Sequence, residues 1–109
     1  PYFGPVLQGL CMARGLEAMA MLKRAGAVDK QIYSIAGDAT GNLIYKRYFN
    51  AIFERISAGA SPEDAFLRER DRVGKDGLRV ASKLKIGAFS GDIEPLLEKT
   101  AQELRDRTD

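Results

Sequence analysis

The side chains that could carry out chemistry are neighbouring carboxylates and one turn rich in glycine. Glu63 and Asp64 are adjacent, and further acids follow along the last predicted helix. Paired carboxylates can act as general acid and base, but acids at exposed helix positions are common without such a role. The turn at 37–41 (GDATG) lacks the Gly-Lys-Ser/Thr end of a phosphate-binding loop. These groups predict neither a catalytic centre nor a dedicated metal site.

The composition points away from enzymes in the same way. The chain contains no His, which removes the commonest general base and a frequent zinc ligand. Its only cysteine, Cys11, cannot form an internal disulfide and lies on an apolar helix face. A small buried thiol is the simplest interpretation. We therefore expect no enzymatic activity, no cofactor and no small-molecule substrate.

Exposed basic edges are the remaining candidates for function. The net charge is only +2, from 17 basic and 15 acidic residues, whereas a nucleic-acid binder usually shows a concentrated basic surface. A solvated helix face is the simpler explanation of each edge, and a contact with another protein is the functional one. The candidate partner-binding residues are Lys46, Arg47, Asn50, Arg68, Arg70, Arg72, Arg79 and Lys83.

The element that organises the chain is a predicted helix at 8–27. Its apolar residues lie almost all the way round, which is typical of a helix buried among others. Gly26 closes it, because glycine readily takes the left-handed conformation after a helix. Arg14 and Glu17 are the two charges that interrupt the apolar pattern of this helix, and they lie three residues apart. Because charges on a mostly buried helix need partners, we expect an ion pair that holds helices in register, and a larger loss of stability from Arg14→Ala than from Arg70→Ala.

Five more helices are predicted after it. A helix at 42–57 stops at Gly59 and has a clear apolar arc of Ile44, Tyr45, Tyr48, Ile52 and Ile56. Ser61 followed by Pro62 is a strong helix start. The charged stretch 68–76 (RERDRVGKD) is predicted to be a solvated helix end and loop, and 87–92 (GAFSGD) a turn. The other helices are expected at 29–38, 78–88 and 92–107, with no strand. The prediction is an all-α, antiparallel six-helix bundle built from helical hairpins, with 1–109 as one domain.

Two features concern the wider organisation. Ala-Gly-Ala occurs at 25–27 and again at 58–60, a spacing of 59 − 26 = 33 residues that also occurs in helical repeat arrays. With only two copies, a closed bundle is favoured over an open array.

No window approaches the ~18 apolar residues of a membrane span, and the sequence starts at Pro1. We therefore expect a domain excised from a longer protein.

Put together, the segments resemble the cytoplasmic domain of the type II secretion system F family, which includes the inner-membrane platform proteins of type II secretion and type IV pilus assembly. The matching pieces run from about residue 1 to 104. The chain departs from the family pattern at two points: Ala88 stands where the family carries Glu, and the charged stretch 68–76 stands where the family often has Pro and large apolar residues. The family-motif positions are Arg14 and Glu17 on the first helix, Gly26, Gly59 and Ser61 at helix ends, and Gly87, Ser90 and Gly91 before the last helix.

The resemblance implies a role and a location. It implies a non-enzymatic scaffold on the cytoplasmic side of the bacterial inner membrane, which links the assembly ATPase to the assembly of pilins or pseudopilins. It also implies self-association and contact with other platform components, without nucleic acid. Two alternatives stay open. One is a soluble helical-repeat adaptor for protein–protein interaction, and the other is a small all-α nucleic-acid-binding domain that would contact DNA through the helix at 42–57.

Overall fold

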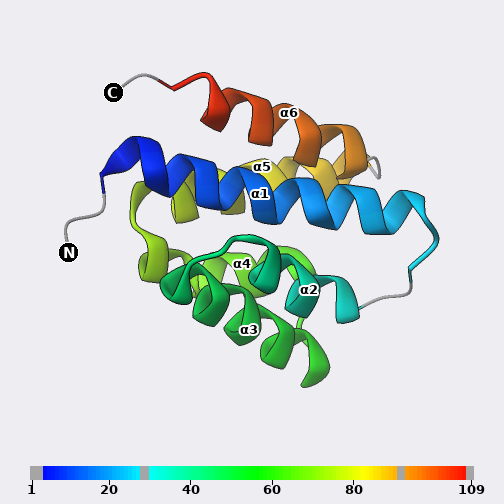
Figure 1. Cartoon of the computed structure of the whole chain (residues 1–109). Helices are drawn as coiled ribbons and strands as arrows, with labels where there is room; N and C mark the ends of the chain where they lie inside the picture. The colour runs from blue at the N-terminus through cyan, green and yellow to red at the C-terminus, as the bar shows by residue number, and fades with distance from the viewer. Residues whose placement is uncertain (1–3, 28–29, 91–92, 108–109) are drawn as a thin grey trace.

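A computed structural model describes residues 4–27, 30–90 and 93–107, with side chains left out at 88–90. Over these residues it contains helices and no strand, which confirms the all-α prediction. Successive helices reverse direction, as in an antiparallel bundle (Figure 1). The elements are α1 (Pro5–Arg24), α2 (Gln31–Ala39), α3 (Leu43–Ser57), α4 (Pro62–Arg68), the 3₁₀ helix η1 (Arg70–Val73), α5 (Lys75–Ser90) and α6 (Ile93–Arg105).

Helix α1 runs through the middle of the bundle. It packs against α2 on one side and α6 on the other, and also touches α5. This explains why its apolar residues lie nearly all the way round: Met12, Leu16 and Met19 are all buried. Because the last helix packs on the first, the hairpins close into a bundle and do not form an open array.

Helix ends follow the local rules of the sequence. The side chain of Asn42 accepts hydrogen bonds from the first amides of α3, and Ser61 accepts one from the amide of Asp64 at 3.2 Å. Gly26 and Gly59 have φ values of +84° and +107°, which residues with a Cβ rarely adopt. Helix α1 begins at Pro5, three residues earlier than predicted, since proline is well suited to the first helical position.

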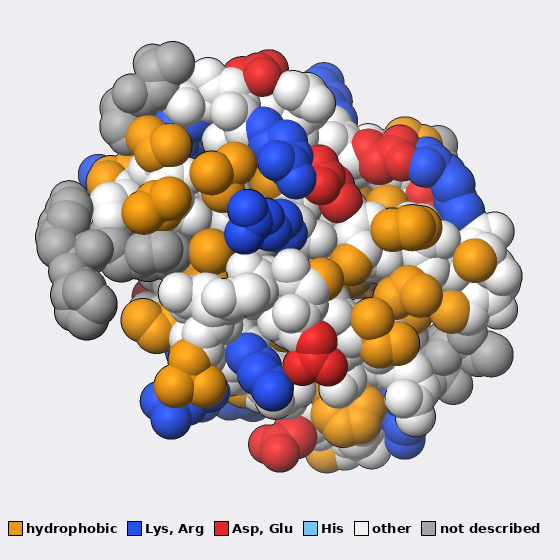
Figure 2. All heavy atoms as spheres, in the orientation of Figure 1, with side chains coloured by type: hydrophobic (Ala, Val, Ile, Leu, Met, Phe, Trp, Pro, Cys, Tyr) orange, Lys and Arg blue, Asp and Glu red, His pale blue; other side chains and the backbone are white. Residues whose placement is uncertain are grey.

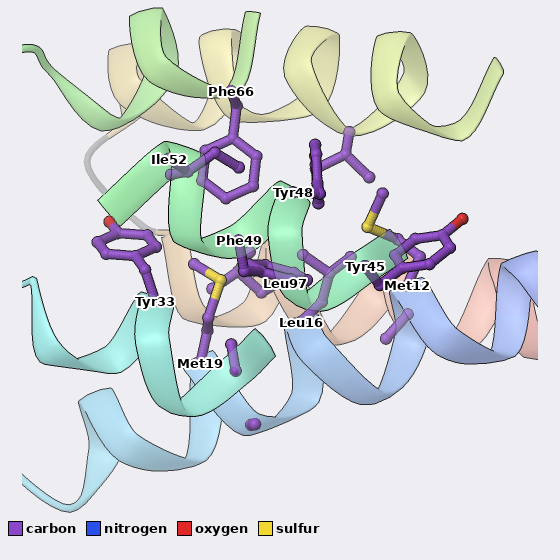
Figure 3. Close-up of a cluster of buried hydrophobic side chains, with 14 of the residues drawn as sticks. Met12, Leu16, Met19, Tyr33, Tyr45, Tyr48, Phe49, Ile52, Phe66 and Leu97 are labelled. Carbon is purple, nitrogen blue, oxygen red and sulfur yellow. The ribbon is translucent and has the colours of Figure 1, made fainter. Parts of the chain in front are cut away.

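Aromatic rings from α3 and α4 form the centre of the core. Phe66 of α4 makes edge-to-face contacts with Tyr48 and Phe49 of α3, with ring centroids 6.1 and 6.3 Å apart. The side chains of Leu16 and Met19 reach this cluster from α1 (Figure 3). Such pairs add roughly 0.5–1.5 kcal/mol each beyond the burial of area.

Two sequence predictions were wrong in the second half of the chain. The stretch 68–76 is not a solvated loop, because Glu69, Val73 and Asp76 are buried, and it contains η1 and the start of α5. The turn expected at 87–92 begins later, because α5 continues to Ser90 and includes Gly87. The mixed charges were misleading because the two buried acids are paired with arginines outside the stretch, Arg55 and Arg107, as well as with Arg72 inside it.

Candidate interaction surface

A buried ion pair joins Asp76, at the start of α5, to Arg107, which lies two residues after the end of α6. Asp76 is 2% exposed, and its carboxylate accepts hydrogen bonds from Arg107 at 2.5 and 3.1 Å. Arg107 also donates to the backbone carbonyl of Pro5 at 3.3 Å. Three helix ends are therefore tied together at one end of the bundle.

The sequence analysis missed both members of this pair, although a signal was present. Asp76 lies four and eight residues before Val80 and Leu84, which are 1% and 2% exposed. Residues at this spacing share one face of a helix, so an acid there faces the core. A buried carboxylate needs a cationic partner, but the local sequence does not identify Arg107.

Glu69 forms a second centre of charge, between α3 and η1. Its carboxylate accepts hydrogen bonds from Arg55 and from Arg72, the latter at 2.5 Å. Burial alone would raise the pKa of the Glu69 carboxyl, but the hydrogen bonds from these two arginines outweigh it and hold the pKa below its usual value. Through Glu69, Arg55 thus anchors the charged stretch to α3.

Ion pairs also join α1 to α6. Glu17 accepts two hydrogen bonds from Arg105, at 2.6 and 2.7 Å, and Arg24 contacts Glu98. Arg14 is exposed and forms no ion pair among the described residues. Glu17 therefore links two helices, whereas Arg14 faces solvent. On the face seen in Figure 2, cations and acids lie beside one another among scattered hydrophobic side chains.

The predicted partner-binding residues do not converge on one site. They lie on α3, on the α4–η1 segment and on α5. Within the described part of the chain, Arg47, Asn50 and Arg79 have no hydrogen bond or ion pair through their side chains. The others are engaged: Lys46 with Asp38, Arg68 with Asp64, Arg72 with Glu69, Lys83 with Glu103, and Arg70 with the carbonyl of Leu67.

The family-motif positions at helix ends have structural surroundings. Ser61 and the two glycines with positive φ lie at helix ends. Gly87 lies in α5, where an added Cβ would come within 2.4 Å of a methyl carbon of Leu96. Ser90 is the last residue of α5, and Gly91 lies outside the described residues.

Burial raises the pKa of side chains in the core. Burial and the nearby Glu63 raise the pKa of Tyr33 to about 12. Burial also raises the pKa of the Cys11 thiol, although Arg14 opposes it. Among the described residues no group of acids and cysteine could hold a metal ion.

The hollow between α4 and α5 is lined by Glu63, Asp64, Leu67, Ala81, Ser82 and Lys85.

The class of protein that these features describe is an all-α domain stabilised by ion pairs between its helices. A search of protein families matches residues 16–109 to the family described as type II secretion system (T2SS), protein F. The chain belongs to this family. No curated protein and no solved structure gave a significant match. Within the part of the chain that the structure describes, no helix is long and apolar enough to cross a membrane.

Proposed function

We propose that this chain is the cytoplasmic domain of an inner-membrane platform protein, which links an assembly ATPase to the assembly of pilin-like subunits. The observation that carries the proposal is the family match over residues 16–109. The parent protein would be anchored in the bacterial inner membrane. The domain would act as a non-enzymatic scaffold that associates with further copies and with other platform components.

The ion pairs between helices support a scaffold role. The two buried acids of the second half, Glu69 and Asp76, are each paired with arginine. Charges that are paired in this way hold helices in place, and breaking a buried pair is strongly destabilising. A domain that passes force or position from one partner to another needs such a rigid frame.

The α3 surface is our candidate contact for the ATPase. Arg47 and Asn50 are three residues apart on the solvent side of α3, and their side chains are not engaged elsewhere among the described residues. Side chains that have no partner within the domain do not have to break an intramolecular hydrogen bond or ion pair when another protein binds. The exposed Leu43 and Ile44 lie at the start of the same helix, so a contact here would combine charge with apolar area.

A co-purification experiment tests the proposal. The tagged parent protein is isolated from membranes of cells that also express its assembly ATPase, and the ATPase is quantified. We expect co-purification, and a loss of at least about fivefold for the Arg47→Glu variant, since truncating or reversing a central interface charge costs about 1 kcal/mol or more. Lys99→Glu, an exposed charge reversal on α6, is the matched control.

The outcomes separate the levels of the proposal. Absence of the parent protein from the membrane fraction would contradict the platform role as a whole. Co-purification that both variants reduce equally would contradict only the assignment of α3 as the contact surface. Protease accessibility in spheroplasts would test whether the domain lies on the cytoplasmic side.

A further inference from the structure

The outward face of α5 combines cations with exposed apolar side chains. It carries the cations Lys75, Arg79 and Lys85, and the only acid of the helix, Asp76, is buried. Two large apolar side chains on the same face are exposed: Leu78 by 53% and Ile86 by 65%. We call this surface the α5 face, and it consists of Lys75, Leu78, Arg79, Ser82, Lys85 and Ile86.

The acids that border the α5 face leave its charge positive. Asp64 of α4 pairs with Arg68 at 3.0 Å, and Glu103 of α6 pairs with Lys83 at 3.5 Å. Glu63 lines the hollow beside α5 together with Lys85. By contrast, Arg79 and Lys75 have no ion pair among the described residues.

Apolar area also continues beyond α5 itself. Leu67 of α4 is 42% exposed and lines the hollow next to Ala81 of α5. The α5 face runs from Lys75 to Ile86, which is about 17 Å along the helix, and cations and apolar side chains alternate over this length. Cations close to an anionic membrane surface are attracted to it by about 1 kcal/mol each, and exposed apolar side chains beside them can be buried in the headgroup region.

The position of the chain ends favours a membrane over a protein as the occupant. Arg107, at the end of the described chain, bonds both Asp76 in the first turn of α5 and Pro5 at the start of α1. Both ends of the domain therefore lie beside the start of the α5 face (Figure 1). In a protein whose chain continues into a membrane, segments that leave from this place would bring the α5 face close to the bilayer.

We propose that the α5 face docks on the anionic surface of the lipid bilayer. This inference rests on the proposed function, because only a membrane-anchored parent protein keeps the domain at the bilayer. The cations would lie among the lipid phosphates, and Leu78 and Ile86 would enter the headgroup region. Docking would set the orientation of the domain and turn α3, on the other side of α4, towards the cytoplasm.

A vesicle-binding experiment tests the electrostatic part. The 109-residue chain is sedimented with vesicles of phosphatidylcholine alone, or with about one third phosphatidylglycerol. We expect binding to the anionic vesicles only, and a loss of about 30-fold for the double variant Arg79→Gln, Lys85→Gln, since each cation near an anionic surface contributes about fivefold. The control Arg14→Gln, Arg47→Gln lowers the net charge equally, from +2 to 0, on exposed positions of α1 and α3.

A fluorescence experiment tests the apolar part. The sequence has no tryptophan, so a single introduced one reports its own surroundings. Ile86→Trp places the probe on the α5 face, and Met21→Trp places it on α1 at the same exposure of 65%. We expect a blue shift on addition of anionic vesicles for Ile86→Trp and none for Met21→Trp.

The outcomes are decisive in either direction. Equal losses for the two double variants would mean that only net charge matters, and this would overturn the docking proposal. No binding to anionic vesicles would overturn it too, and binding of an acidic protein by the same face would then reassign it. Neither result would contradict the proposed platform function. The vesicles contain no ATPase, and the co-purification experiment does not depend on the α5 face.

Discussion

Asp76 and Arg107 lie 31 residues apart in the sequence and form a two-pronged ion pair with distances of 2.5 and 3.1 Å. The Asp76 side chain is 2% exposed and that of Arg107 is 13% exposed. Because Arg107 also bonds the carbonyl of Pro5, this one pair fixes the start of α1, the start of α5 and the end of α6. It is the best single point at which to test what holds the bundle closed.

Asp76→Asn should lower the free energy of unfolding by about 3 kcal/mol, because it leaves the Arg107 guanidinium largely buried without a counter-charge. Thermal unfolding followed by circular dichroism would report a melting temperature lower by about 10–20 °C. Asp71→Asn, an exposed acid of η1, is the control and should change little. Equal melting temperatures for the two variants would show that the ion pair adds nothing to stability.

Gly77→Ala should destabilise the domain by about 3 kcal/mol or more. A Cβ at this position would lie 2.0 Å from the backbone oxygen of Arg70, so the backbone of η1 or α5 would have to move. Gly87→Ala is the control in the same helix, because its new methyl group meets the flexible end of Leu96. Urea denaturation of both variants would measure the difference, and a cost for Gly87→Ala as large as for Gly77→Ala would contradict the argument.

From the structure we expect Arg70→Ala to cost more stability than Arg14→Ala, which is the opposite of the order expected from the sequence. Arg14 is exposed and has no ion pair among the described residues, so Arg14→Ala should change the unfolding free energy by less than about 0.5 kcal/mol. Arg70 donates to the carbonyl of Leu67 at 2.6 Å, and Arg70→Ala should cost about 1 kcal/mol. Chemical denaturation of the two variants would decide between this order and the one inferred from the sequence.

Glu69 should make the stability depend on pH in acid. Its pKa is lowered in the folded state, where burial is outweighed by hydrogen bonds from Arg55 and Arg72. Its contribution is therefore complete above the unfolded-state pKa of about 4.3 and is lost as the pH falls through the lower folded-state value. We expect Glu69→Gln to cost about 1–2 kcal/mol at pH 7.

The pH dependence of that variant provides the check. Between pH 5 and pH 3 the Glu69→Gln variant should lose less stability than the unaltered chain, because it has no carboxyl to protonate at this position. Glu54→Gln, an exposed acid on α3, serves as the control for a general loss of negative charge. Parallel stability curves for Glu69→Gln and the unaltered chain would contradict the role assigned to Glu69.

The sequence by itself determined the helices and most of their ends. Apolar spacing placed Tyr45, Tyr48 and Ile52 on one buried face of α3, although Ile44 of the same predicted arc is 51% exposed. Ser61 and Gly59 marked helix ends where the structure has them. These predictions succeeded because periodicity and capping depend on residues within a few positions of one another. The same is true of the family motifs, which agree with the match over 16–109.

Only the tertiary structure decided which distant arginines pair with the buried acids and which charges face solvent. Asp76 and Glu69 looked like part of a solvated run, and their partners Arg107 and Arg55 lie 31 and 14 residues away. Arg14 looked central but faces solvent, because the direction of a side chain around α1 depends on where α2 and α6 pack. Long-range packing sets these pairings, and no local pattern of charges records it.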